Sequence, residues 1–430
     1  MDRMIGFPPG EASRVMLANW QDPPSVRWAF RHMRELIPSQ TIPAGPTPAA
    51  DLPQGEQVDL AAITVERLSG ATTSVEDVLD ETSTDAVILM HDGVLLNEHY
   101  YAGSTDLTPH LVMSVSKSIV GCVAGILAGR GELDVAAPVE QYVPEVADSG
   151  YGQATVRDLL DMRTGVQFRE TYDAPDAEVR VMERSMGWRP RLDGDPVGAY
   201  AYLASLDRAG PHGGTFTYRS ADTDMLGWVC ERAADNRMAD LVATLLWQPM
   251  GAERDAEITC DSVGTGVHDG GISAIPRDLA RFGQMLLDEG RVGGREIVPA
   301  SWLADSWDRP DDVRAAFAAS GNEAVLPGGW YRNQFWFVPK PRGTALVCLG
   351  IHGQMVYVNR ETGLVAVKVS SWPAPQDTSS LVDTLRAFGA VGAALAERGE
   401  ASTSGSRGRR RRGRRSRSLT TPRAARTLEA

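Results

Sequence analysis

Strand-forming runs lie near the two ends of this chain, and the long stretch between them has the pattern of helices and loops. Residues 86–90 and 94–101 are apolar, β-prone runs separated by His91-Asp92-Gly93, a sequence typical of a hairpin turn. If strands from the two ends of the chain pair in one antiparallel sheet, and the segment between them is helical, the architecture is α+β. We therefore predict an antiparallel sheet flanked by helices, with a mostly helical lobe. The later strands are predicted at 346–349, 355–358 and 364–369.

The predicted helices follow apolar residues that recur at helical spacing. Residues 114–131 form the clearest of them, with Gly131 as the stop signal. Thr155 and Asp158 have the spacing of a capping box, which predicts a helix start there. The remaining helices are predicted at 25–36, 221–234, 238–246, 276–289 and 378–398.

Composition divides the chain into three parts. Residues 1–60 are rich in proline and are predicted to be an arm packed on a larger body. Residues 61–400 are predicted to be one domain, with the helical lobe at about 138–290. Residues 401–430 contain ten arginines and one glutamate among small polar residues. Such a segment cannot bury a core, so we predict a disordered tail.

The charge pattern limits the partners of this protein. The net charge of -13 combines a basic tail with residues 1–400, which carry 33 basic against 55 acidic side chains. Such an acidic body argues against a nucleic-acid-binding fold. No apolar run reaches the length of a membrane span, and the first 20 residues contain no secretory signal. We expect a cytoplasmic protein with no membrane partner.

The cysteines and histidines give no sign of a metal site. The four cysteines lie far apart without a C-x-x-C pair, and the seven histidines have no paired ligand spacing. The cysteines are therefore interpreted as small buried hydrophobic residues in a reducing compartment. We predict that the protein needs no metal and no organic cofactor.

Lysine is rare in this sequence, which draws attention to the positions that keep it. Only three of the 43 basic residues are lysines: Lys117, Lys340 and Lys368. Ser114 and Lys117 lie three residues apart at the start of a predicted helix, so they share one face. A lysine whose pKa is lowered by burial and by the positive end of a helix can activate a serine hydroxyl. We therefore predict that Ser114 is a nucleophile and Lys117 its base.

Two further segments could complete such a site. Tyr218 precedes the predicted helix at 221–234, where its phenol could relay a proton to a leaving group, although a packing role would also fit. Residues 350–354 form a glycine-bounded element on a late strand, whose backbone N–H groups could join that of Ser114 in an oxyanion hole. His352 is expected to orient the backbone of this strand rather than to act as a base.

The order of these motifs resembles the serine β-lactamase and penicillin-recognising superfamily. Within it, the chain is most similar to the 6-aminohexanoate-dimer hydrolases, nylon-oligomer-degrading enzymes that share their fold with carboxylesterases. The resemblance covers about residues 18–395. It is carried by residues 19–24, 113–118, 185–189, 216–224, 350–354 and 370–373.

The resemblance implies a β-lactamase/transpeptidase-like fold for residues 61–400 and a role for each matching residue. Ser114 would be the acylated nucleophile, Lys117 its base, and Tyr218 the proton donor and acceptor. The backbone N–H groups of Ser114 and Ile351 would form the oxyanion hole. Three matching aromatic residues would contact the substrate: Tyr172, from a mobile loop that reaches the amide nitrogen, and the pocket residues Trp188 and Trp336.

Two acidic residues depart from the pattern of the efficient dimer hydrolase. Glu183 stands where that enzyme has an aspartate facing the substrate amine, and Asp269 stands where it has an asparagine. Two acidic groups at the entrance would still favour a substrate with a cationic amine, but the positions of their contacts with that amine would differ. Ester hydrolysis depends less than amide hydrolysis on protonation of the leaving group. We therefore expect a serine hydrolase that forms an acyl-enzyme with carboxylic esters and also with short linear amides such as 6-aminohexanoate oligomers.

Two alternatives remain open at this point. A D-alanyl carboxypeptidase or a β-lactamase shares the chemistry but works outside the cytoplasm, which the missing signal peptide disfavours. A non-catalytic protein that retained the fold would not need Ser114, Lys117 and Tyr218 together. The expected partner is a small-molecule ester or amide, and a homodimer is left open.

Overall fold

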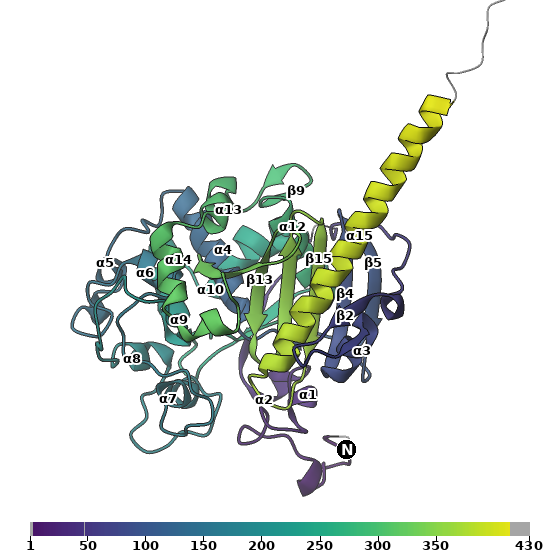
Figure 1. The fold of residues 1–430 in the computed structure, drawn as a ribbon. Helices are drawn as coiled ribbons and strands as arrows, with labels where there is room; N and C mark the ends of the chain where they lie inside the picture. Colours follow the sequence, from purple (N-terminus) through teal and green to yellow (C-terminus); the bar gives the residue numbers. More distant parts are fainter. Residues whose placement is uncertain (1–2, 47, 413–430) are drawn as a thin grey trace, which may run out of the picture.

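A seven-stranded antiparallel sheet joins the two ends of the chain. In the computed structural model, which describes residues 3–46 and 48–412, with side chains up to residue 398, the strand order is β11-β12-β13-β14-β15-β4-β5. The late strand β15 pairs directly with the early strand β4, with Val365 opposite Met90 (Figure 1). The predicted α+β fold is confirmed. The strands are β4 (Thr84–His91), β5 (Val94–Tyr100), β11 (Trp330–Arg332), β12 (Phe335–Pro339), β13 (Thr344–Gly350), β14 (Gln354–Asn359) and β15 (Leu364–Ser370).

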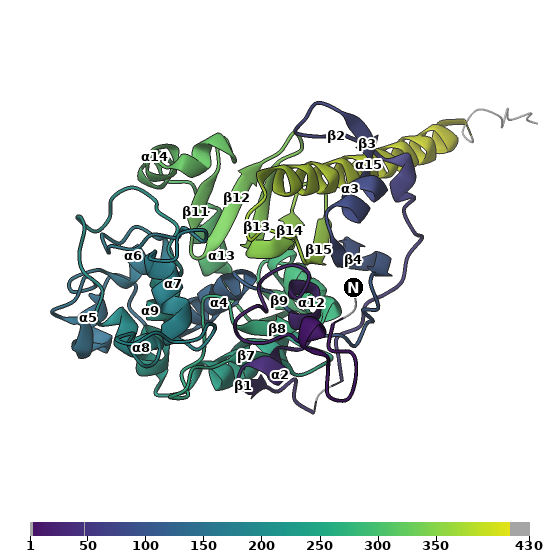
Figure 2. The same ribbon diagram turned by 90° about the horizontal axis from the view of Figure 1, so that it is seen from below.

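Helices cover both faces of this sheet (Figure 2). The side chains of β4 alternate between two hydrophobic clusters, with Val87 in one and Ile88 in the other. Helices α3 (Val75–Glu81) and α15 (Thr378–Arg412) cover the first side, and α4 (Val115–Gly129) and α12 (Pro276–Leu287) cover the second. The sequence placed α12 in the helical lobe, but it packs on the sheet. Gly283 allows this approach, because a Cβ there would lie 2.6 Å from Val365.

The helical lobe lies beside the sheet, on the side of α4 (Figure 1). Its helix α9 packs against α4 in the centre of the molecule. The predicted capping box at Thr155 is present, since its side chain accepts from the backbone of Asp158. The lobe contains α5 (Val139–Tyr142), α6 (Val156–Leu160), α7 (Glu178–Ser185), α8 (Ala199–Leu203), α9 (Ser220–Ala234), α10 (Met238–Leu241), a π-helical segment (Val242–Trp247) and α11 (Gln248–Met250).

The structure contains a second sheet that the sequence did not predict. Its strand β6 leads into the N-terminal end of α4. Its order is β1-β7-β8-β6, and its strands are too short to show an alternating pattern. The arm supplies one of them and also contains two short helices in place of the single helix predicted at 25–36. These elements are α1 (Val26–Ala29), α2 (Met33–Leu36), β1 (Ser39–Ile42), β6 (His110–Leu111), β7 (Ala256–Thr259) and β8 (Ile272–Ala274).

The remaining elements lie at the periphery. They are β2 (Thr64–Glu66), β3 (Thr72–Ser74), β9 (Arg291–Val292), β10 (Arg295–Glu296), α13 (Ala300–Trp307), α14 (Asp311–Ala318) and several single 3-10 turns. Within the described residues, no helix combines the length and the apolar character needed to cross a membrane.

Helix α15 is longer than predicted. The sequence indicated an end near residue 398, whereas the helix continues to Arg412 and so includes the first part of the predicted tail. Each residue added to an existing helix forms a hydrogen bond without a new nucleation cost, and arginine is a good helix former. Residues 413–430, the rest of the predicted disordered tail, lie outside the described residues. The predicted domain limits at 60 and 400 stay predictions.

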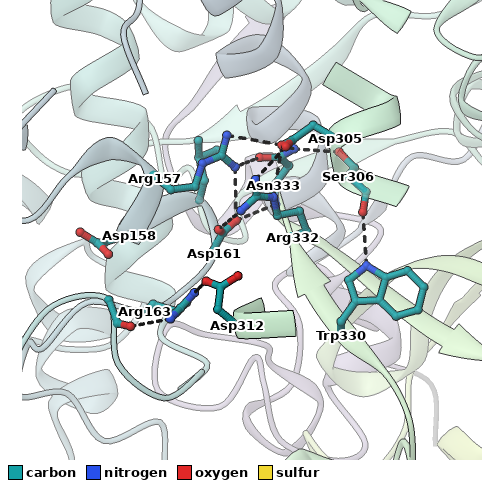
Figure 3. A network of polar contacts seen from close by, with 12 residues as sticks. Arg157, Asp158, Asp161, Arg163, Asp305, Ser306, Asp312, Trp330, Arg332 and Asn333 are labelled. Carbon is teal, nitrogen blue, oxygen red and sulfur yellow. Dashed lines mark hydrogen bonds and ion pairs between the residues drawn. The ribbon is translucent and has the colours of Figure 1, made fainter. Parts of the chain in front are cut away.

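A polar network joins the sheet to the helical lobe at the turn between β11 and β12 (Figure 3). Arg332 donates to Asp161 of α6 at 2.6 Å and to Asp305 of α13 at 2.7 Å. Arg157 of α6 is paired with the same Asp305 at 3.4 Å, and the Asn333 amide donates to it at 2.8 Å. Three elements from distant parts of the sequence are therefore held at one turn.

The next residue of this turn, Gln334, reaches the helices behind the site. Its carbonyl oxygen accepts from the Ser118 hydroxyl of α4 at 2.8 Å, and its Oε1 accepts from Thr223 of α9 at 2.8 Å. Its amide donates to the carbonyl of Leu159 at 2.9 Å. Helix α4 comes close because Gly121 has no side chain, and a Cβ there would lie 2.6 Å from the backbone of the turn. Helices α4, α6 and α9 thus meet at one buried amide.

We predict that Gln334→Ala lowers the free energy of unfolding by about 2 kcal/mol, because it leaves buried donors and acceptors without partners. Urea unfolding of the full chain, followed by circular dichroism, measures this change. Gln54→Ala is the matched control, since Gln54 is exposed and its side chain forms no hydrogen bond within the described residues. Equal stability of the two variants would contradict the bridging role of Gln334.

Candidate active site

Ser114 lies at the N-terminal end of α4, directly before the first helical residue. Strand β6 ends at Leu111, and the chain turns through Met113, whose φ of 47° is in the left-handed region. Such a backbone conformation is uncommon outside glycine and is found where the surrounding structure holds it in place. The turn leaves the Ser114 side chain 7% exposed at the junction of a pocket and a cleft.

Lys117 lies one helical turn further along α4, and its side chain is 1% exposed. Its Nζ is 2.9 Å from Ser114 Oγ, as the predicted spacing requires. The same nitrogen is 3.1 Å from Ser220 Oγ at the start of α9 and 2.8 Å from the carbonyl oxygen of Asp269. The Asp269 carboxylate lies 3.3 Å away. Three segments of the chain therefore meet at one buried nitrogen.

The protonation of Lys117 differs from the prediction. Burial lowers the pKa of Lys117, as expected, but Tyr218, Asp269, Glu170 and Asp224 act in the opposite direction and together hold it above its usual value. The prediction of a lowered pKa is therefore wrong for the free protein. Lys117 is an ammonium group at neutral pH, and its neutral form, which could accept a proton, becomes more common as the pH rises.

Tyr218 joins this group from the segment before α9. Lys117 Nζ lies 5.3 Å from the centre of its ring, and the ring stacks on Trp336 with centroids 5.3 Å apart. Burial raises the pKa of Tyr218, while Lys117 and the Ser114 hydroxyl act against this shift. The phenol is thus neutral at rest and able to donate a proton. Tyr218 packs in the aromatic cluster and also lines the cleft beside Ser114, and its role in proton transfer stays a prediction.

The backbone of Ile351 faces Ser114 from the end of β13. Both residues border the pocket and the cleft. Among the residues that the structure describes, neither the Ser114 nor the Ile351 N–H has an acceptor. Two free donors beside a serine hydroxyl are what an oxyanion hole requires.

His352 fixes the backbone next to Ile351. Burial lowers the pKa of His352 to about 4, so its ring is neutral, and Nδ1 donates to the carbonyl oxygen of Trp372 at 2.7 Å. The Trp372 N–H in turn donates to the His352 carbonyl at 3.1 Å. Gly353 completes the turn with a φ of 89°, and a Cβ there would lie 2.3 Å from the Trp372 ring. This geometry agrees with the orienting role expected of His352.

Two spaces of different size open on Ser114. One is an enclosed pocket of about 20 Å³ that includes Tyr172, Glu183 and Trp188 in its wall. The other is an open cleft of about 740 Å³ that includes Tyr218 and Trp336. The two tryptophans predicted to contact substrate therefore lie in different compartments. A substrate whose carbonyl lies at Ser114 would place its two halves on opposite sides of the serine.

Glu170 is a site residue that the sequence analysis missed. Its carboxylate accepts from Tyr172 OH at 2.6 Å and from the Ser220 hydroxyl at 2.6 Å, and the Ser220 backbone N–H donates to it at 2.8 Å. Because Ser220 also contacts Lys117, a continuous hydrogen-bonded path runs from Tyr172 to the lysine. Burial raises the pKa of Glu170, against the opposing effect of Lys117. Only its position two residues before Tyr172 could have drawn attention to it.

Asp224 is the second residue that was missed, and it supports the Asp269 loop from behind. Its Oδ1 accepts from the backbone N–H groups of His268 and Asp269 at 2.8 and 3.0 Å. Burial raises the pKa of Asp224 well above its usual value, and the neighbouring Asp269 adds to the shift. Asp269, held by Asp224 in this way, places its carboxylate 3.3 Å from Lys117 Nζ.

The two acidic residues predicted to attract a cationic amine are both occupied. Glu183 receives hydrogen bonds from Arg180 and Arg189, each at 2.6 Å, and its side chain is buried. The Asp269 carboxylate is paired with Lys117. The structure thus differs from the expectation of two free carboxylates at the entrance. The physical reason is the pair of arginines, which neutralises Glu183 within the protein.

The site contains the groups needed for acyl transfer. Ser114 offers a hydroxyl beside a lysine, Tyr218 is a phenol near both, and the N–H groups of Ser114 and Ile351 have no acceptor among the described residues. Within the described chain, no group of three or more His, Cys, Asp or Glu side chains is arranged to hold a metal ion.

Comparison with known proteins identifies relatives of this chain. Residues 73–390 match the family described as Beta-lactamase. The chain is 37% identical over 396 residues to the 6-aminohexanoate-dimer hydrolase of Paenarthrobacter ureafaciens, an alignment that covers 90% of this chain and 97% of that protein. A candidate 6-aminohexanoate-dimer hydrolase from Bacillus anthracis has a similar structure, with a TM-score of 0.82 at 27% identity over 90% of this chain and 99% of that one.

A more distant structure shares the fold alone. A family VIII carboxylesterase has a TM-score of 0.55 at 16% identity, over 78% of this chain and 99% of that one.

The raised pKa of Lys117 predicts that Ser114 becomes more reactive as the pH rises. Only the neutral amine accepts the serine proton, so the rate of fluorophosphonate labelling should increase steeply from about pH 6 to about pH 9. Asp269→Asn removes a carboxylate that raises this pKa, and it should shift the profile to lower pH by about one unit. Labelling is followed by mass spectrometry of the Ser114 peptide. Asp193→Asn, an exposed change of the same kind, is the control, and identical profiles for the two variants would contradict this assignment.

Proposed function

The chain belongs to the beta-lactamase family and is a hydrolase, and from this premise we propose that it cleaves carboxylic esters through an acyl-enzyme on Ser114. The observation that carries the proposal is the 2.9 Å contact between Ser114 Oγ and the buried Lys117 Nζ. Esterases and amidases of this kind need a serine whose proton has an acceptor within hydrogen-bond distance.

Acylation begins when Ser114 Oγ attacks the ester carbonyl and its proton passes to the neutral amine of Lys117. The carbonyl oxygen becomes an oxyanion, which the N–H groups of Ser114 and Ile351 stabilise. The bond to the alcohol then breaks, and the phenol of Tyr218 gives its proton to the departing alkoxide. The products of this half are the free alcohol, the acyl-serine, a Tyr218 phenolate and a Lys117 ammonium, which attract each other.

Deacylation returns the site to its starting state. A water molecule enters the space left by the alcohol, gives a proton to the Tyr218 phenolate and attacks the acyl carbonyl. When the acyl bond breaks, Lys117 returns its proton to Ser114 Oγ. The carboxylic acid leaves, and both the amine and the phenol are restored. The path through Ser220 and Glu170 holds Lys117 in place through both halves.

The substrate class follows from the lining of the two compartments. The open cleft includes aromatic side chains such as Phe216 and Trp336, and the enclosed pocket includes Met182, Met186 and Trp188. In these walls Glu183 and Asp269 are paired with cations, and Glu170 accepts from Ser220. Asp377, at the open cleft, is exposed and accepts from the Ser380 backbone N–H. The site therefore favours uncharged acyl groups and small alcohols.

Short linear amides are the second candidate substrates. The relative from Paenarthrobacter ureafaciens is named a 6-aminohexanoate-dimer hydrolase, and Tyr172 lies in the wall of the enclosed pocket beside Ser114. An amide needs stronger protonation of its leaving group than an ester does. We therefore propose amide cleavage as the slower activity. A cytoplasmic location and a homodimer stay predictions.

We predict that Ser114→Ala lowers the kcat for p-nitrophenyl acetate by about 10³-fold or more, because the acyl-enzyme cannot form. Turnover is measured by release of p-nitrophenol. Ser262→Ala, an exposed serine whose side chain forms no hydrogen bond within the described residues, should retain full activity. Equal rates for wild type and Ser114→Ala, or no activity in either, would refute the catalytic proposal and leave a non-catalytic protein of this fold.

Because Glu183 is already paired with two arginines, we predict that a terminal amine on the substrate changes the rate of hydrolysis little. Methyl 6-aminohexanoate and methyl hexanoate should have kcat/KM values within about fivefold of each other, since Glu183 and Asp269 are already paired with cations. Asp377 is exposed, so solvent and salt screen its attraction for the ammonium group. A preference of about 100-fold for the amino ester would show that Glu183 or Asp269 binds the amine after all.

A stability measurement accompanies this comparison. Glu183→Gln should lower stability by about 3 kcal/mol, because Arg180 and Arg189 lose their buried partner. Glu178→Gln, on the same helix, weakens the pair with Arg169, which is half exposed, and leaves an amide oxygen to accept from the Arg169 backbone N–H, so it should cost less than about 1 kcal/mol.

A further inference from the structure

An open groove of about 640 Å³ lies on the far side of the segment that walls the catalytic cleft. Ser371 and Pro373 line this groove, whereas Trp372 between them lines the cleft. The other side of the groove is built by the N-terminal arm and α1, at the lower edge of the molecule in Figure 1. The groove is therefore separate from Ser114 but adjacent to the Trp372 backbone that holds His352.

Among the described residues that line the groove, three are arginines and none is acidic. The arginines are Arg3, Arg27 and Arg31. Such a lining is unusual in this protein, because residues 1–400 carry 55 acidic against 33 basic side chains. Three guanidinium groups that gather on so acidic a body, with no carboxylate among the described lining residues, have the charge of an anion-binding site.

The guanidinium groups keep nitrogens available for a ligand. Arg27 uses its Nε toward Asp85 at 2.9 Å and Ser371 at 3.4 Å, and its two terminal nitrogens have no partner in the described part of the chain. Arg31 donates from Nε and Nη1 to backbone carbonyls, which leaves its Nη2 free among the described residues. The Nε of Arg3 is buried and also lacks a partner there. Each arginine is thus fixed in place, while at least one of its guanidinium nitrogens has no acceptor among the described residues.

The positive charge of this group is only partly neutralised. Asp85 is fully buried behind the groove, where it is shared by Arg27, His110 and the Ser371 hydroxyl. Burial lowers the pKa of Arg31, Asp85 opposes this shift, and Arg27 adds to it. One carboxylate facing two fixed guanidinium groups leaves an excess of positive charge, which an oxyanion would relieve.

The rest of the lining is apolar. Pro23, Pro24, Val26 and Trp28 line the groove beside the arginines. A volume of about 640 Å³ is also larger than a bare inorganic ion needs, and it falls in the range of small-molecule sites. An apolar wall with fixed donors at one point suits a ligand with a charged head and a hydrocarbon body.

We propose that this groove binds a small organic anion, with its carboxylate or phosphate group on Arg3, Arg27 and Arg31 and its apolar body along Trp28 and the prolines. The two head groups share the chemistry of an oxyanion that accepts paired N–H donors. This site is independent of the catalytic proposal, because none of its lining residues contacts Ser114 or Lys117.

The test is calorimetric titration of the full chain, with Ser114 first blocked by a fluorophosphonate so that the catalytic site cannot bind the probe. Hexanoate and hexyl phosphate are titrated at low salt, and hexanol serves as the uncharged probe. We expect saturable binding of at least one anion, with one site per chain, and no binding of hexanol. The stronger of the two anions identifies the head group.

Variants locate the binding site. Arg3→Gln removes one guanidinium, and Pro373→Glu introduces a carboxylate at an exposed lining position without disturbing the Asp85 pair. Each should weaken anion binding about tenfold. Arg14→Gln is the matched control, because Arg14 lies on the same arm but does not line the groove; its affinity should stay within about twofold of wild type. Absence of saturable binding, binding of hexanol at equal strength, or unchanged affinity in Arg3→Gln and Pro373→Glu would each overturn the proposal.

Discussion

The burial of one ammonium group, that of Lys117, is the constraint on which the site depends. A buried cation is stable only when acceptors surround it, because its hydration is lost. The acceptors of Lys117 come from Ser114 on its own helix, from Ser220 at the start of α9 and from Asp269 before β8. The fold has to bring these three segments together. The small sheet and the amide of Gln334 hold α4 and its neighbours in that arrangement.

The lysines of this chain show how strongly neighbours decide protonation. Lys117 and Lys368 are both almost fully buried. Burial lowers the pKa of Lys368 to about 7, against the opposing effect of Asp85. Its Nζ contacts the carbonyl of Thr82 and the hydroxyl of Ser370 and lies over the Trp372 ring. The acidic groups around Lys117 reverse the effect of its burial. The scarcity of lysine singled out a residue of the site, but the lysines whose pKa falls toward neutrality, Lys340 and Lys368, lie outside it.

Local sequence patterns predicted the elements whose stabilising contacts lie within a few residues of the chain. The hairpin around His91, the capping box at Thr155 and helix α4 were found because turn residues, caps and helical spacing act over a few residues. That the early and late strands share one sheet followed from the need of apolar strands to pair, whereas the direct pairing of β15 with β4 came only from the structure. The short strands β6 and β8 were missed, since two or three residues have no periodicity and are stabilised only by non-local pairing.

The sequence by itself determined the reactive residue types and the contact between Ser114 and Lys117, because helical geometry fixes the distance between residues three apart. Only the tertiary structure decided which charged groups of the site are paired with one another. It paired Glu183 with Arg189, placed the Asp269 carboxylate at Lys117 and brought Glu170 to Ser220. These contacts join segments far apart in the chain, and an electrostatic interaction depends on a distance in space that sequence spacing does not set.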